Sequence, residues 1–198
     1  MREPENIRQL LDLVEPDFMG MIFYQKSPRF ISQLDWESFQ WENTQRVGVF
    51  VNESISTINT AVEMFGLQIL QLHGGESIET VRELKQKVAL PIIKVFSVQD
   101  VLPLKEMEAF TKEVDYFLLD TKTPAYGGSG HQFDWSILSE YSFDVPFFLS
   151  GGIGTNDIEK IKTINLHNLF AIDVNSKFEK QPGLKDIESI IQFKKGLA

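Results

Sequence analysis

The sequence predicts an α/β chain of the (β/α)8 TIM-barrel class, with the first β-strand missing from its 198 residues. Short apolar segments alternate with amphipathic or polar segments, and no two-residue hairpin signal is evident between them. The predicted strands end at residues 24, 51, 72, 96, 120, 150 and 173, which are separated by 21 to 30 residues. This pattern is typical of βα units around a parallel sheet. Residues 1–198 are therefore predicted to form a single TIM-barrel domain.

Each predicted strand is an apolar segment of six or seven residues. The seven are Phe18–Tyr24, Arg46–Val51, Leu67–Leu72, Pro91–Phe96, Asp115–Asp120, Val145–Ser150 and Asn168–Asp173. The amphipathic segments around them predict eight helices, at Pro4–Val14, Asp35–Trp41, Ser54–Phe65, Ser77–Val88, Gln99–Lys112, Trp135–Tyr141, Thr155–Thr163 and Leu184–Phe193. Ser54 and Ser77 are suitable N-caps for two of these helices, since a serine hydroxyl accepts from the first free N–H groups.

The predicted elements include one helix more than strands, and a helix comes first. We therefore expect the chain to start at an internal methionine, one strand into the barrel. Strands Phe18–Tyr24 and Asn168–Asp173 would then be unpaired edges beside an opening into the apolar interior. Such an edge predicts low stability or closure by another chain, so a homo-oligomer through the open barrel edge is possible.

Composition excludes several classes of partner. A net charge of -9 and a pI near 4.9 argue against a nucleic-acid partner, although a local basic pocket could bind one phosphate. The charged start and the lack of an apolar run near 20 residues predict no membrane partner and a cytoplasmic protein. The absence of cysteine excludes disulfides, and three scattered histidines have no metal-ligand spacing, so neither a metal nor a cofactor is expected.

The most informative segment is 117–135, where an apolar strand ends at Asp120 and a loop with Gly127, Gly128 and Gly130 comes next. Glycines without Cβ atoms allow backbone N–H groups to approach a ligand. A solvated aspartate before a flexible loop is the alternative interpretation. The pattern of Asp120-Thr121, the glycine-rich loop and Phe133-Asp134-Trp135 resembles the sixth strand and loop of the phosphoribosylanthranilate isomerase family of tryptophan biosynthesis. The resemblance extends over nearly the whole chain.

Two further strand ends resemble the same family. Tyr24-Gln25-Lys26-Ser27-Pro28-Arg29 matches the loop in which an arginine binds the anthranilate carboxylate, and Arg29 would have that role. Its planar guanidinium suits a bidentate pair with a carboxylate, although a solvated arginine after a turn is the alternative. Gln71-Leu72-His73-Gly74 matches the end of the fourth strand, which implies that His73 lines the pocket as a substrate-binding or packing residue.

A phosphate site is predicted at two adjacent strand ends. Gly151 and Gly152 precede a predicted helix, where free N–H groups and the helix dipole favour an anion. Asn175 and Ser176 come after the next strand, as in the paired phosphate-binding loops of many barrels, and Gly128 is a further predicted phosphate-binding residue. The family usually continues Ser-Ser-Gly-Val-Glu, whereas this chain has Lys177 in place of the glycine, which leaves the geometry of this loop open.

The resemblance implies an Amadori rearrangement of N-(5'-phosphoribosyl)anthranilate, a phosphosugar substrate, without cofactors. Asp120 would be the general acid that protonates the ring oxygen, and Asp173 would hold a ribose hydroxyl. The family's general base is a cysteine in a Cys-Gly-Met motif after the first strand, and Met1 to Asn6 resembles the segment directly after that cysteine. We therefore expect the 198-residue form to be inactive. The alternative is a variant in which another residue is the base.

Two other functions remain open from the sequence. One is another phosphate-binding barrel enzyme, of the ribulose-phosphate epimerase or indole-glycerol-phosphate synthase type. The epimerase would require metal-binding histidines at strand ends, and the synthase a catalytic lysine, for which Lys94 is a candidate. The other is a noncatalytic barrel that binds a phosphorylated aromatic ligand.

Overall fold

The computed structural model describes residues 3–31, 33, 35–121 and 132–198. Their main feature is a parallel sheet in which the strands are neighbours in chain order, from β1 to β7. The strands are β1 (Phe18–Ile22), β2 (Gln45–Phe50), β3 (Ile69–Leu72), β4 (Ile92–Val98), β5 (Tyr116–Thr121), β6 (Phe147–Leu149) and β7 (Leu169–Ile172). This confirms the predicted α/β class with parallel strands, and each predicted strand is present within two residues of its expected ends.

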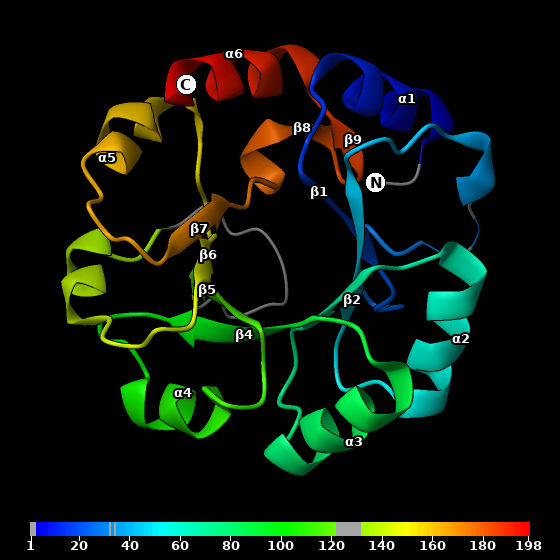
Figure 1. The fold of residues 1–198 in the computed structure, drawn as a ribbon. Helices are drawn as coiled ribbons and strands as arrows, with labels where there is room; N and C mark the ends of the chain where they lie inside the picture. Colours follow the sequence, from blue (N-terminus) through cyan, green and yellow to red (C-terminus); the bar gives the residue numbers. More distant parts are fainter. Residues whose placement is uncertain (1–2, 32, 34, 122–131) are drawn as a thin grey trace.

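The helices surround the sheet as an outer ring (Figure 1). They are α1 (Pro4–Leu13), α2 (Ile55–Phe65), α3 (Ile78–Val88), α4 (Leu104–Phe110), α5 (Ile158–Lys162) and α6 (Ile187–Leu197). The first and last helices lie side by side, and Lys194 on α6 donates hydrogen bonds to the carbonyl oxygens of Val14 and Glu15 at 2.7 and 2.8 Å. Among the described residues, no helix is long and apolar enough to span a membrane.

Successive side chains along each strand point to opposite faces of the sheet, which produces two apolar layers. On β5, Phe117 and Leu119 pack in the large core that includes the helices, whereas Leu118 points to a smaller cluster on the other face of the sheet. This arrangement reflects the two-residue period of a strand. The smaller cluster contains buried Val47, Ile69, Ile93, Val95, Leu118 and Phe148. Both faces of the sheet are therefore covered, as the near-continuous apolar strands predict.

Local signals determine where the helices begin. The hydroxyls of Ser54 and Ser77 accept hydrogen bonds from the backbone N–H groups of Thr57 and Thr80, both at 3.2 Å. The predicted caps of α2 and α3 are thus confirmed. An N-cap of this type stabilises a helix by about 1 kcal/mol.

Two predicted helices are wrong in type. The segments Asp35–Trp41 and Trp135–Tyr141 contain 3₁₀ stretches, at Trp36–Ser38 and Trp135–Glu140. In the first of these, tertiary contacts outweigh helix propensity, because the indole N–H of Trp41 donates to the carbonyl oxygen of Trp36 and both rings lie against the Arg46 guanidinium.

A hairpin near the carboxyl terminus was not predicted. Strands β8 (Glu179–Gln181) and β9 (Leu184–Lys185) pair antiparallel, and Gly183 adopts a φ of 87° in the turn between them. The predicted helix start at Leu184 is therefore wrong, and α6 begins at Ile187 after the N-cap Asp186. Pro182-Gly183 is a turn signal that would have indicated this hairpin.

Candidate active site

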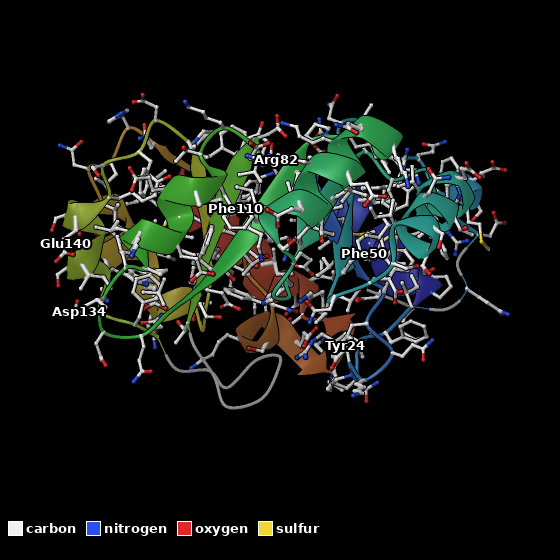
Figure 2. The ribbon with its side chains drawn as sticks, turned by 90° about the horizontal axis from the view of Figure 1, so that it is seen from below. Tyr24, Phe50, Arg82, Phe110, Asp134 and Glu140 are labelled. Atoms are coloured by element: carbon white, nitrogen blue, oxygen red, sulfur yellow. The ribbon has the colours of Figure 1, made fainter. Side chains whose placement is uncertain are left out.

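A cavity of about 240 Å³ lies at the carboxyl ends of the strands. Of the nine predicted site residues, Gly128 lies outside the described residues, and the other eight line the cavity: Arg29, His73, Asp120, Gly151, Gly152, Asp173, Asn175 and Ser176. Tyr24, which also lines it, lies in Figure 2 at the end of the molecule where the orange β8–β9 segment is found, whereas Arg82 on α3 lies at the opposite end. The residues predicted separately from the strand ends thus meet at one site.

Asp120 lies near the end of β5, and its carboxylate faces His73. The distance from His73 Nε2 to Asp120 Oδ2 is 3.4 Å, and the two side chains are 28% and 26% exposed. Gln71 Nε2 lies 3.3 Å from His73 Nδ1. When the Gln71 amide donates to Nδ1, the ring proton is on Nε2 and points toward Asp120. Asp120 is therefore both accessible from the cavity and in contact with a group that can exchange a proton with it.

Asp173 comes directly after β7 and accepts a hydrogen bond from Ser150 Oγ at 2.7 Å. Burial raises the pKa of Asp173, and the nearby charge of Asp120 raises it further, while the Ser150 hydrogen bond acts in the opposite direction. The carboxyl of Asp173 is thus held at the cavity in an environment that disfavours its ionised form. A protonated or partly protonated carboxyl can donate a hydrogen bond as well as accept one.

Arg29 lines the cavity and forms a bidentate pair with Glu179, a residue that was not predicted to belong to the site. Arg29 Nε lies 3.1 and 2.9 Å from the two Glu179 carboxylate oxygens, and Nη2 lies 2.6 Å from Oε2. The side chains are 11% and 3% exposed. The pair uses the Nε–Nη2 side of the guanidinium, which leaves the Nη1–Nη2 end outside it.

Lys185, on β9, completes this group. Its ammonium donates to Asn175 Oδ1 at 2.7 Å, to the Asn175 carbonyl oxygen at 3.2 Å and to Glu179 Oε1 at 3.2 Å. Burial opposes the ionisation of Glu179, but Arg29 and Lys185 outweigh it, so the pKa of Glu179 lies below its usual value. At Lys185, burial outweighs the attraction of the Glu179 and Asp173 carboxylates and lowers the pKa. The two directions differ because burial is the dominant influence on Lys185, whereas the two cations together outweigh burial at Glu179.

The glycine loop after β6 requires its glycines. Gly151 and Gly152 adopt φ values of 93° and 65°, which favour glycine. A Cβ on Gly151 would lie 2.2 Å from Thr121 Oγ1 and 2.5 Å from the Thr121 backbone nitrogen. In the neighbouring loop, Lys177 is not among the residues with positive φ and lies in the 3₁₀ stretch Ser176–Phe178. The loop therefore forms without a glycine at this position.

Lys94, the candidate lysine for a synthase-type reaction, is not among the residues that line the cavity. Its ammonium lies 2.7 Å from the Gly74 carbonyl oxygen and 3.1 Å from Glu76 Oε2, and the two side chains are 4% and 3% exposed. Glu76 also accepts from the backbone N–H groups of Asn52 and Gly74. Lys94 thus belongs to a buried ion pair that anchors the loop after β3.

Comparison with known proteins identifies the family. The family model described as N-(5'phosphoribosyl)anthranilate (PRA) isomerase matches residues 2–195. An N-(5'-phosphoribosyl)anthranilate isomerase from Parabacteroides distasonis is 41% identical over 197 residues, which cover 98% of this chain and 88% of that protein. The crystal structure of phosphoribosyl anthranilate isomerase from Thermotoga maritima superposes with a TM-score of 0.82 at 36% identity and covers 100% of this chain and 95% of that one.

A further solved phosphoribosyl anthranilate isomerase is in complex with reduced 1-(o-carboxyphenylamino)-1-deoxyribulose 5-phosphate. It superposes with a TM-score of 0.79 at 32% identity and covers 100% of this chain and 94% of that one. These matches agree with the resemblance of the strand-end motifs and with the parallel βα architecture. The chain belongs to the N-(5'-phosphoribosyl)anthranilate isomerase family.

Proposed function

We propose that this site rearranges N-(5'-phosphoribosyl)anthranilate to 1-(2-carboxyphenylamino)-1-deoxyribulose 5-phosphate. The observation that carries the proposal is that Arg29, Asp120 and the glycine loop line one cavity. The substrate has an aromatic carboxylate at one end, a phosphate at the other and the reacting sugar carbons between them. A site with an arginine, a proton donor and an anion-binding loop matches these three parts.

The two ends of the substrate would be held by different elements. Arg29 would bind the anthranilate carboxylate, since Arg29 lines the cavity and a guanidinium pairs well with a carboxylate. The loops with Gly151, Gly152 and Ser176 would bind the phosphate through backbone N–H and hydroxyl groups. Asn175 directs its amide oxygen to Lys185, which leaves its Nδ2 group as the available donor. Binding both ends holds the sugar in the reactive position.

In the proposed reaction, Asp120 donates a proton to the furanose ring oxygen while the anilino nitrogen forms the C1'=N bond and the ring opens. A base then removes the C2' proton, and the resulting enolamine takes up a proton at C1' while the C2' hydroxyl loses its proton, which gives the C2' ketone. Asp173 would hold a ribose hydroxyl during these steps. His73, in contact with Asp120, would line the pocket beside the acid.

We also propose that the seven strands are part of a single eight-stranded barrel domain that a further strand closes between β1 and β7. These are the terminal strands of the described sheet. The cavity extends beside β1. It is lined there by Leu10 of α1, Val14 directly after α1, Met19 of β1 and Ile190 of α6. An apolar strand would cover these side chains and pair with both edges. In the family, this strand carries the cysteine base.

The acid role is tested by Asp120→Asn in a form extended upstream by a strand that ends in Cys-Gly. Turnover should fall by about 10² to 10⁴, since general acid catalysis contributes rate enhancements of this size. The affinity for reduced 1-(o-carboxyphenylamino)-1-deoxyribulose 5-phosphate should remain largely unchanged. Turnover is measured by the loss of phosphoribosylanthranilate fluorescence. Near-wild-type turnover would remove Asp120 from the acid role.

The origin of the base is tested by comparing the 198-residue chain with the extended form. We expect isomerase activity only in the extended form, because the 198 residues contain no cysteine. A matched variant with serine in place of the added cysteine controls for the effect of strand pairing on folding. If the 198-residue chain is active without the extension, a residue of this chain is the base.

A further inference from the structure

We propose that Glu179 is a positioning residue for Arg29, the residue that would bind the substrate carboxylate. Glu179 holds Arg29 so that the Nη1–Nη2 end of its guanidinium faces the cavity. It thereby sets the selectivity for an aromatic acid. This inference rests on the proposed function and extends it to a residue that does not line the cavity itself. Three observations support it, namely the geometry of the Arg29 pair, the charges of the group and its attachment to the fold.

The Arg29 guanidinium has two edges that can each bind a carboxylate, and Glu179 occupies one of them. Glu179 binds Nε and Nη2 at distances of 2.6 to 3.1 Å. The remaining bidentate edge, formed by Nη1 and Nη2, is the one suited to a second carboxylate. An arginine side chain has several rotatable bonds, and fixing it before the ligand arrives reduces the entropy lost on binding.

The charges of the group match a single carboxylate. Arg29 and Lys185 contribute two positive charges and Glu179 one negative charge, so the three together have a net charge of +1. Lys185 directs its three N–H bonds to three acceptors, two on Asn175 and one on Glu179. Lys185 also lines the cavity, but these three acceptors occupy its N–H bonds, so Arg29 is the cation with donors left for the ligand.

The fold fixes Glu179 in place. Its Oε1 accepts from the Gly183 backbone N–H at 3.1 Å, within the β8–β9 hairpin. Asn6, a buried residue of α1, forms two hydrogen bonds with the backbone of Lys185, at 3.0 and 2.7 Å. The hairpin that carries Glu179 and Lys185 is thus attached to the first helix, and Arg29 is held against a rigid support.

The test compares two ligands by calorimetry. One is reduced 1-(o-carboxyphenylamino)-1-deoxyribulose 5-phosphate, and the other is the same compound without the carboxylate. The measured quantity is the ratio of their affinities, so a general loss of folded protein cancels. In Glu179→Gln, we expect this ratio to fall about tenfold, because the charge-assisted support of Arg29 is lost. The ligand without the carboxylate should bind as it does to the wild type.

Whether the affinity ratio falls or rises in Glu179→Gln distinguishes a positioning role of Glu179 from a purely electrostatic one. Glu179→Gln raises the net charge of the group from +1 to +2, so a purely electrostatic role predicts tighter binding of the carboxylate ligand. An unchanged or increased ratio would overturn the inference. Glu76→Gln is the matched control, since Glu76 is equally buried but pairs with Lys94 away from the cavity lining. Its ratio should equal that of the wild type.

A second measurement does not depend on the ligand. In NMR spectra, the Nε–H group of Arg29 should exchange slowly with solvent in the wild type and at least tenfold faster in Glu179→Gln. Fast exchange in the wild type would overturn the positioning role even when both ligands bind. Absence of binding by the wild type, with a slowly exchanging Nε–H, would instead contradict the proposed function and the selectivity that rests on it.

Discussion

Two glutamates with buried side chains, Glu76 and Glu179, lie in the segments that follow β3 and β7, and each pairs with a cation. The Glu76 carboxylate and the Lys94 ammonium form hydrogen bonds with backbone groups of the loops after β2 and β3. The Glu179 carboxylate holds Arg29 at the cavity. Both glutamate side chains are 3% exposed, so burial does not distinguish them.

The difference lies in where the cation can direct its remaining donors. Lys94 directs its ammonium to Glu76 and to carbonyl oxygens, and it does not line the cavity. Arg29 has a second bidentate edge and does line it. One buried ion pair therefore lies away from the cavity lining, whereas the other includes a residue that lines the cavity. Substitutions in the two pairs should separate these roles.

The largest effect is expected for Lys94→Met, which leaves Glu76 buried without its cation. Removal of one partner of a buried pair destabilises a protein by about 3–5 kcal/mol. The melting temperature should fall by roughly 6–20 °C for a chain of this size. Thermal unfolding measures the effect, and the double variant Lys94→Met with Glu76→Gln should recover part of the loss. A melting temperature within a degree of the wild type would show that this pair does not anchor the loop.

A smaller loss of stability is expected for Arg29→Gln than for Lys94→Met, because Lys185 still pairs with the Glu179 carboxylate. The main effect of this variant is expected on ligand binding. The variant loses a charge-assisted pair with the ligand carboxylate, which is worth about 1.5–3 kcal/mol or roughly 10- to 150-fold in affinity. The loss should appear in the titration with the carboxylate ligand and be absent with the analogue that lacks the carboxylate. Equal losses for both ligands would mean that Arg29 acts through the structure of the loop.

The difference between the Glu76–Lys94 pair and the Glu179–Arg29 pair could not be predicted from the sequence. The strand ends could be predicted from local patterns, and parallel strands bring their carboxyl ends to one edge. Arg29, His73, Asp120 and Asp173 were assigned to the site through the resemblance of these strand ends to the family. The partner of Arg29 is 150 positions away along the chain, and no local pattern predicts such a pair. Glu179 itself belongs to a hairpin whose sequence resembles a loop before a helix.

The fold shows the same division between local and tertiary determinants. Caps such as Ser54 and Ser77 were predictable because the capping bond spans three residues. The segment Asp35–Trp41 was mispredicted because its conformation depends on Arg46, which lies beyond it in the chain. For Lys94, the sequence predicts the strand on which it lies but not its role. Its buried pair with Glu76 is a tertiary contact, and this pair directs its ammonium away from the cavity.

The smallest effect is expected at a third carboxylate, Asp173, which accepts from the Ser150 hydroxyl. Its pKa is raised from an ordinary value of 3.8, mainly by burial. Since the folded state binds this proton more tightly than the unfolded state, stability is lost as the pH rises from 3.8 through the folded pKa. Asp173→Asn removes this titration and still accepts from Ser150.

The variant Asp173→Asn should therefore be more stable than the wild type at pH 8, with a higher urea midpoint and a higher melting temperature. The difference should shrink as the pH falls, because the folded wild type takes up the Asp173 proton more readily than the unfolded chain does. Urea unfolding at several pH values measures it, and ligand affinity should fall as stability rises. A difference that does not vary with pH would mean that Asp173 resembles Glu179, with its charge compensated by the surrounding groups.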